Sequence, residues 1–302
     1  MISPILKLRN MALRSLPIGL VSRTSHISRI TSLIQNRFSS SKRWQARQLR
    51  DQFSREASVQ GLKSRAAFKL LQIDERYRIF KSGQTVVDLG YAPGSWSQVA
   101  LTRTEPHGRV LGVDIIPSQP PKGVSTIQGN FLNPEVQSYV REFVRDTQRG
   151  RPYSQGVSQH TDIPEKIIQS VLEANSAGHH KGNGEPESVH NDVSDTQRTV
   201  DLVLSDMMMN TSGITFKDHA GSMDLCRAAL LFSYEVLKSG GHFVCKFYQG
   251  SEDKDLEKQL KALFQKVHRL KPESSRSESK ETFFIALDRK PHAKKEEVFP
   301  PI

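Results

Sequence analysis

The segment from Thr85 to Thr102 constrains the fold of this chain more than any other part. TVVDLG (85–90) has the pattern of a short buried strand that runs into a glycine turn, and SWSQVALT (95–102) has the pattern of a helix that begins at that turn. In doubly wound α/β folds, ligands bind at the carboxyl ends of such strands. The sequence therefore predicts an α/β layered fold with a ligand site near residues 88–96.

Further strands and helices alternate along the chain. Apolar periodicity predicts strands at 109–114, 124–128, 200–205, 241–248 and 282–287, and helices at 63–80, 134–145, 219–238 and 253–264. Alternation of this kind implies a largely parallel sheet that is covered on both faces. Residues 269–281 leave no room for a crossover helix before the last strand, so we expect that strand to be antiparallel.

The first 50 residues contain ten Lys or Arg residues and no Asp or Glu, in a chain whose net charge is +11. Arg and Ser among scattered apolar residues, without acids, are typical of a mitochondrial transit peptide. A basic arm that binds nucleic acid is the alternative. We expect a transit peptide at 1–41 that delivers the protein to the mitochondrial matrix, a folded domain at 42–290 and a C-terminal tail at 291–302. Cleavage near Arg37 to Ser41 would remove six positive charges.

Residues 146–199 are rich in Gly, Ser, Asn, His and Gln and poor in large apolar residues. We expect a largely disordered insertion there, with one short helix near 163–172, and solvated histidines rather than a metal site. Cys226 and Cys245 match neither a zinc site nor a disulfide framework. The chain also has no apolar run of the roughly 18 to 20 residues that would cross a bilayer.

Two carboxylates follow predicted strands at the edge that carries the glycine turn. Asp114 ends RVLGVD, from where a carboxylate can accept hydrogen bonds from both hydroxyls of an adenosine ribose, and Asp206 follows VDLVLS. Gly90 and Gly94 lack the G-x-G-x-x-G spacing, which opposes a nicotinamide-dependent oxidoreductase. Lys246 lies among apolar residues in FVCKFY, where an unpaired charge is costly, so we expect it to have a partner.

Five motifs, in order, resemble those of the FtsJ/RrmJ ribosomal RNA methyltransferase family. They are DLGYAPGSWSQ, LGVDI, LSDM, FVCKFYQG and KPESSRSESKETFFIAL, and SRAAFKL is similar to the family's leading motif. The resemblance covers roughly residues 45–145 and 200–290. It implies a Rossmann-like, S-adenosylmethionine-dependent methyltransferase with a mostly parallel seven-stranded sheet.

The resemblance also implies the roles of individual residues. The family's catalytic tetrad carries over as Lys69, Asp206, Lys246 and Glu281, and its cofactor contacts as Gly94, Trp96, Asp114, Asn130 and Asp206. We expect Lys246 to accept the proton of a ribose hydroxyl, with Lys69 as a second cation and no metal ion. The chain departs from the family at Asn130, which replaces an acidic residue, at Tyr91 and Ser95, and at Met208 and Met209.

The resemblance implies an RNA substrate. With a mitochondrial address, it points to large-subunit ribosomal RNA and to a uridine of the peptidyl-transferase A-loop. The basic stretch from Lys42 to Lys69, with Trp44 and Phe53, is expected to contact phosphates and bases. Two alternatives stay open, namely a relative that acts on tRNA or an mRNA cap, and a ribosome-assembly factor whose main task is binding.

Overall fold

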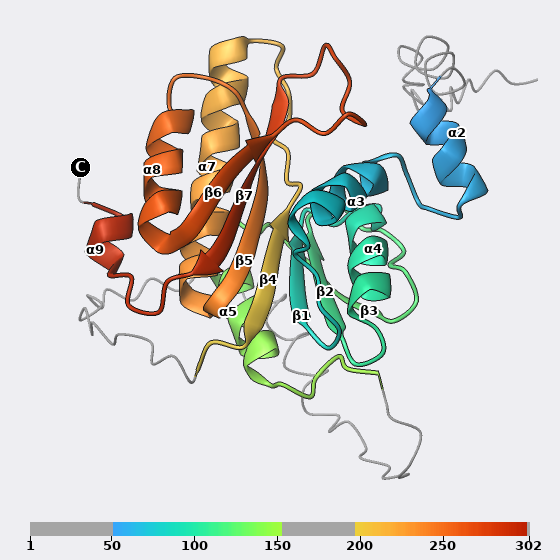
Figure 1. Ribbon diagram of the computed structural model, residues 1–302, viewed down its shortest axis with the longest axis horizontal. Coiled ribbons are helices and arrows are strands. Elements are labelled where there is room, and N and C mark those ends of the chain that lie inside the picture. Colours follow the sequence, from blue (N-terminus) through green and yellow to red (C-terminus); the bar gives the residue numbers. More distant parts are fainter. Residues whose placement is uncertain (1–50, 153–196, 301–302) are drawn as a thin grey trace, which may run out of the picture. The chain divides into compact units, whose positions relative to one another are not determined.

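The computed structural model describes residues 51–152 and 197–300, so the expected transit peptide and the helix expected near 163–172 lie outside the described residues. The described parts contain a seven-stranded sheet, and Figure 1 shows its strands between two sets of helices. The strands are β1 (Thr85–Leu89), β2 (Arg109–Asp114), β3 (Val124–Gln128), β4 (Val200–Ser205), β5 (Leu237–Tyr248), β6 (Phe264–Leu270) and β7 (Glu281–Arg289). The helices are α2 (Gln52–Val59), α3 (Ala66–Tyr77), α4 (Ser95–Thr104), α5 (Pro134–Arg145), α7 (Thr215–Val236), α8 (Asp253–Leu263) and α9 (Lys295–Val298).

The strands lie in the order β3-β2-β1-β4-β5-β7-β6. Neighbours from β3 through β5 pair in parallel, whereas β7 pairs antiparallel with both β5 and β6. The predicted α/β class and the antiparallel last strand are therefore confirmed. Strand β6 was not predicted, because it is an edge strand in which only Phe264 is fully buried and the apolar alternation is weak.

Side chains that alternate along each strand build two separate cores. In β4, Leu202 and Leu204 pack with α3 and α4, while Val203 packs on the opposite face with α5, α7 and α8. Each buried aliphatic side chain contributes about 1.5 to 3 kcal/mol by leaving water. Because even-numbered residues of β4 face α3 and α4, residue 206 just beyond the strand is directed to the same side.

Arg109 extends the folded domain into the segment that was expected to be an insertion. Its buried guanidinium donates to the carbonyls of Val144 and Arg149, at 2.6 and 3.0 Å, and to the carbonyl of Asp146. A buried guanidinium requires such acceptors, so they bind residues 146–149 to β2. The expectation of disorder is therefore wrong for 146–152, and residues 153–196 lie outside the described ranges.

The last residues also join the core. Helix α9 lies within the expected tail, but Val298 is fully buried and Phe299 packs edge-on against Tyr234 at 5.9 Å. This part of the expected tail therefore packs on the domain, because the face of α8 and α7 that it covers is apolar. In the described parts of the chain, no helix has the length and apolar character needed to cross a membrane.

Candidate functional site

Four titratable side chains meet at the carboxyl edge of β4 and β5. Lys246 Nζ lies 3.0 Å from Asp206 Oδ1 and donates a hydrogen bond to the Asp206 carbonyl at 2.7 Å. Lys69 Nζ lies 2.7 Å from Glu281 Oε1. The structure thus brings together all four residues of the tetrad that the resemblance implied, as two ion pairs.

Lys246 is held in a nearly dry position by the pattern of its strand. Val244 belongs to the core beneath α3 and α4, and Lys246 points to the same face two residues later, paired with Phe283 of β7. Its side chain is only 7% exposed, whereas that of Asp206 is 19% exposed. Asp206 Oδ1 is buried, and the Lys246 ammonium is its ion-pair partner.

The Lys69–Glu281 pair stands next to this lysine. Burial by itself would raise the pKa of Glu281, but the Lys69 ammonium, hydrogen bonds from Lys69 and Ser275, and the Lys246 charge hold it below its ordinary value. Lys69 Nζ also lies 5.8 Å from the centre of the Phe283 ring, on the face that Lys246 shares. Glu281 is therefore an ionised carboxylate between the two lysines.

Tyr248 is a member of the site that the sequence analysis missed. It lies two residues after Lys246 and pairs with Glu281 across the strands, which places the three side chains on one face. Burial raises the pKa of its hydroxyl, and the charges of Glu281, Asp218 and Asp206 add to this effect against that of Lys246. In the sequence, the position of Tyr248 two residues after Lys246 in a predicted strand was the signal that both side chains share one face.

The glycine turn lies beside Asp206. Gly90 has φ +79°, and a Cβ there would lie 2.8 Å from both N and Cα of Met207, so the turn and the β4–α7 loop approach more closely than any other residue permits. Gly94, at φ +104°, is the N-cap of α4. Asp88 lies beneath this turn, fully buried, and accepts a hydrogen bond from Ser97 Oγ at 2.6 Å.

The environment of Asp88 favours its neutral form. Burial raises its pKa to about 7, against the hydrogen bond from Ser97, and the charges of Asp206 and Asp114 add to the rise. Its other oxygen, Oδ1, has no hydrogen-bond partner among the described residues. Asp114 and Asp206 are therefore the carboxylates that make the surroundings of the glycine turn favourable for a cation.

Asp114 lies at the end of β2 next to the same turn. Its Oδ2 accepts from the Ala92 amide and its Oδ1 from the Ile116 amide, both at 2.9 Å. The Gly129 amide donates to the Asp114 carbonyl at 2.8 Å, which sets Asn130 one residue away from this contact. Asn130 Oδ1 accepts from the Leu132 amide at 3.0 Å.

Apolar side chains are exposed beside these two residues. Ile115 and Ile116 directly follow Asp114, Leu132 lies two residues after Asn130, and all three are exposed. A polar carboxylate and amide flanked by exposed apolar side chains match a flat, partly polar ligand such as a purine.

Trp96, which was expected to contact the cofactor, has its side chain inside the protein. The ring is buried, stands 5.6 Å from Phe283, and donates through Nε1 to the Ala66 carbonyl at 2.9 Å. The indole therefore joins α4 to α3 and β7. Contact with a ligand is left to the backbone N–H groups in the first turn of α4, which have no partner within the helix.

The departures at Tyr91 and Ser95 are accommodated within the protein. Tyr91 is buried across Gly112, where a Cβ would lie 2.7 Å from its ring, and its hydroxyl donates to the Ser118 carbonyl at 2.7 Å. Ser95 Oγ lies 2.7 Å from Ser64 Oγ. Both changes support the turn rather than obstruct it.

The basic stretch expected to contact RNA is partly used inside the protein. Phe53 packs against Phe68 at 5.5 Å, and Arg65 lies over the Phe53 ring and pairs with Asp51. Phe53 is thus used in part within the protein, because α2 contacts α3 through this ring, and its contact with bases stays a prediction. Residues 42–50, with Trp44, lie outside the described ranges.

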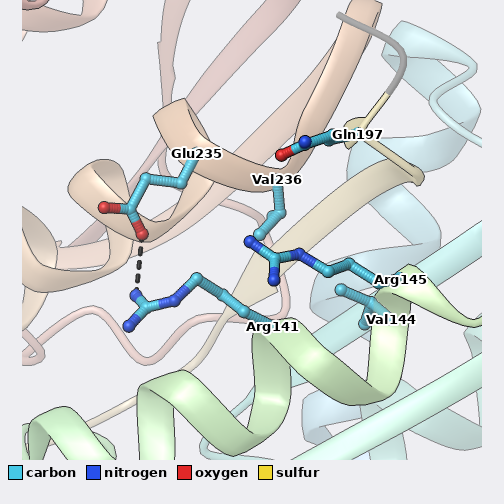
Figure 2. Close-up of a pocket in the computed structure, with 6 residues that line it drawn as sticks. All are labelled: Arg141, Val144, Arg145, Gln197, Glu235 and Val236. Carbon is cyan, nitrogen blue, oxygen red and sulfur yellow. Dashed lines mark hydrogen bonds and ion pairs between the residues drawn. The ribbon is translucent and has the colours of Figure 1, made fainter. Parts of the chain in front are cut away.

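A pocket of about 240 Å³ lies at the opposite, amino edge of the sheet. Figure 2 shows the side chains that line it, which are Arg141, Val144, Arg145, Gln197, Glu235 and Val236. Arg141 donates to Glu235 at 2.7 Å, so the charges nearest this pocket are partly neutralised. Ligands of parallel sheets bind at the carboxyl edge, which favours the tetrad over this pocket. No group of three His, Cys, Asp or Glu residues gathers as metal ligands in the part of the chain that is described.

Comparisons with known proteins identify the family of this chain. The model of the FtsJ-like methyltransferase family matches residues 62–289. The chain is 38% identical to "rRNA methyltransferase 2, mitochondrial" of Saccharomyces cerevisiae, over 86% of this chain and 91% of that protein, and 36% identical to the protein of the same name from Schizosaccharomyces pombe, over 82% and 96%. It is 35% identical to "Ribosomal RNA large subunit methyltransferase E" of Zymomonas mobilis, over 83% and 90%.

Proposed function

Because the chain belongs to the FtsJ-like methyltransferase family, we propose that it transfers a methyl group from S-adenosylmethionine to a ribose 2′-hydroxyl of ribosomal RNA. The observation that carries this proposal is the tetrad, in which a nearly buried lysine lies between two carboxylates at the carboxyl edge. The chain is a methyltransferase, and the identity of its substrate is the part that we propose.

The residues around the glycine turn fit S-adenosylmethionine. Gly90 and Gly94 give the two ends of the turn the positive φ that it needs, the first turn of α4 offers N–H groups to a carboxylate, and the negative charge of Asp114 and Asp206 suits a cationic ligand. Asp88 Oδ1 is a buried oxygen that has no hydrogen-bond partner within the described residues. Asp114 and Asn130, with the exposed apolar residues beside them, would hold the adenosine.

When bound, the cofactor would supply a methyl group that is already activated on a positively charged sulfur. The protein then has to position one hydroxyl and accept its proton. Lys246 Nζ would accept this proton after losing its own, and the hydroxyl proton would end on that nitrogen. Asp206 and Glu281 would orient the hydroxyl and the lysines, and Lys69 would hold the ribose through its ammonium.

We place the target in large-subunit ribosomal RNA of mitochondria, at a uridine, and the protein in the mitochondrial matrix. The support is the naming of the relatives, two of which are mitochondrial rRNA methyltransferases and one a large-subunit methyltransferase. The acid-free Arg-rich N-terminus points to the same compartment.

The test of the reaction is single-turnover methylation of large-subunit ribosomal RNA fragments or immature subunits. Lys246→Ala should lower the rate by about 10²- to 10⁴-fold, the contribution of a general base, while cofactor affinity measured by calorimetry stays unchanged. Lys246→Arg should not restore the rate, because a guanidinium keeps its proton. Lys238→Ala is the matched control, since Lys238 lies at the other end of β5 and pairs with Asp201 at 2.8 Å.

The pH profile separates a base from a residue that only orients. The wild-type rate should rise with pH if Lys246 must lose its proton first, and normal turnover of Lys246→Arg would refute that role. Mapping 2′-O-methyl groups on mitochondrial ribosomal RNA with and without the protein identifies the nucleotide. If a methylation-dead variant still supports assembly of the large subunit, the protein also has an assembly role.

A further inference from the structure

A second group of exposed apolar side chains adjoins the tetrad and has no part in the proposed reaction. Met208, Ile214 and Phe216, which we call the apolar rim, are 57%, 62% and 73% exposed and lie between β4 and the first turn of α7. In Figure 1 this connection lies at the same end of the sheet as the β6–β7 connection. Large apolar side chains that gather in water beside an active site commonly mark a binding surface.

The loop that carries the apolar rim is anchored on both sides. Met207 lies against Gly90, and Met209 packs against Gly221 of α7. At the far end, the Asp218 carboxylate accepts hydrogen bonds from the Ser212 amide and hydroxyl, both at 2.7 Å, and from the Gly213 amide at 3.1 Å. Met207, Met209 and the hydrogen bonds to Asp218 therefore hold the loop in place. The exposure of the apolar rim follows from this loop conformation.

Two contacts connect the apolar rim to the tetrad. The Tyr248 hydroxyl donates to Met208 Sδ at 3.6 Å, and Tyr248 is two residues from Lys246. Lys280 Nζ donates to Thr215 Oγ1 at 3.1 Å, and Lys280 directly precedes Glu281. The loop of the rim is therefore in contact with Tyr248 and Lys280, which neighbour Lys246 and Glu281.

The chemistry of the rim's surroundings suits nucleic acid. Lys280 and Lys217 stand next to Thr215 and Phe216, and the carboxylate of the adjacent Asp218 accepts hydrogen bonds from the loop. Apolar and aromatic faces flanked by cations stack unpaired bases and attract their phosphates. An RNA chain that places one ribose at Lys246 also brings the adjacent nucleotides close to the site. Those nucleotides come within reach of the apolar rim.

We propose that the apolar rim, with Phe216 as its main element, stacks on a nucleobase next to the methylated nucleotide in an unpaired stretch of the RNA. This inference rests on the proposed function. Bases in an A-form duplex are stacked on one another and cannot offer a free face to Phe216, so the rim selects target nucleotides with unpaired neighbours.

The test compares Phe216→Ala with Phe216→Trp in methylation of a large-subunit ribosomal RNA fragment. Loss of one stacked base should raise the RNA concentration for half-maximal rate about five- to a hundredfold, while the saturating rate and cofactor affinity change less than about twofold. Phe216→Trp should retain binding. Tyr139→Ala, which removes an exposed aromatic ring from α5, is the matched control and should have no effect.

The salt dependence of RNA affinity and a modified RNA distinguish stacking on a base from contact with phosphates. Phe216→Ala should leave the slope of RNA affinity against salt unchanged, whereas Lys280→Ala should reduce it, because only the lysine releases counterions. An RNA with abasic sites on both sides of the mapped nucleotide should lose about as much affinity as Phe216→Ala, and the two losses should not add. Ile214→Ser provides a second variant with a smaller loss in the same direction.

The outcomes distinguish the two proposals. Unchanged half-saturation by RNA in Phe216→Ala and Ile214→Ser, with Lys246→Ala inactive, would overturn the stacking role and leave the methyltransferase reaction intact. A change in self-association or in binding of a ribosomal protein, with normal RNA kinetics, would assign the rim to a protein partner and also overturn the proposal. Absence of methyl transfer to any ribosomal RNA by the wild-type protein would refute the proposed function itself.

Discussion

Replacing Asp88 by Asn should make the ligand-free protein more stable at neutral and alkaline pH. The side chain is fully buried beneath the glycine turn, and burial together with the charges of Asp206 and Asp114 raises its pKa from 3.8 to about 7. The amide of Asn has the same shape and no charge, and its oxygen can still accept the hydrogen bond from Ser97. The substitution therefore removes the cost of ionisation and keeps the main contact.

The magnitude follows from proton linkage. Between about pH 4 and pH 7 the folded state keeps a proton that the unfolded state has lost, so the free energy of unfolding falls as the pH rises through this window and levels off above it. One pKa unit corresponds to about 1.4 kcal/mol, so the complete penalty approaches about 4 kcal/mol. Between pH 5 and pH 8, Asp88 alone should cost the wild type about 2 to 3 kcal/mol.

Urea unfolding at pH 5, 6, 7 and 8 measures this penalty. The free energy of unfolding of Asp88→Asn, relative to that of the wild type, should increase across the series by the stated amount. For Asp224→Asn, which neutralises an exposed carboxylate on α7, the free energy of unfolding should change with pH as it does in the wild type. If the free energy of unfolding of Asp88→Asn also follows that of the wild type, Asp88 does not titrate in this range and the argument from burial is refuted.

Three further predictions concern the glycine turn, the cofactor and the compartment. In thermal unfolding, Gly90→Ala should destabilise the protein by about 1 to 3 kcal/mol more than Gly83→Ala. Both residues have φ near +80°, but only a Cβ at Gly90 would meet Met207. Equal losses of stability in the two variants would mean that the contact with Met207 is relieved at no cost. Asp114→Ala should weaken S-adenosylmethionine binding by about 1.5 to 3 kcal/mol in calorimetry, and unchanged affinity would locate the adenosine elsewhere. Residues 1–45 fused to a reporter should direct it to mitochondria, and a diffuse cytosolic or nucleolar signal would contradict a transit peptide.

The order of the strands and helices could be predicted from the sequence because it depends on local periodicity. The short, mainly apolar runs of β1, β2 and β4 indicate buried strands, and the short connection before β7 leaves only an antiparallel strand. Local patterns also located the carboxyl edge, and with it Asp114 and Asp206. Strand β6 was not predicted, because a polar edge strand has little apolar alternation to detect.

The site required both the motifs and the fold. The motifs named Lys69, Asp206, Lys246 and Glu281, but the partners could not be read from the sequence, since Lys69 and Glu281 come from α3 and β7 at opposite ends of the chain. Tyr248 and the apolar rim were not anticipated for the same reason. Their relevance comes from neighbours on other strands and loops.

Tertiary contacts also decided where the folded domain begins and ends. Composition predicted disorder from residue 146 and a tail from residue 291, yet Arg109 binds the carbonyls that follow α5, and Val298 fills an apolar position beside α8. Composition records how many apolar residues a segment has, and so it determines whether the segment can form a core of its own. A short segment can also join a core that other elements form. Its polar and apolar groups then need hydrogen-bond partners and apolar surfaces from distant parts of the chain, and the sheet must form before these partners come together.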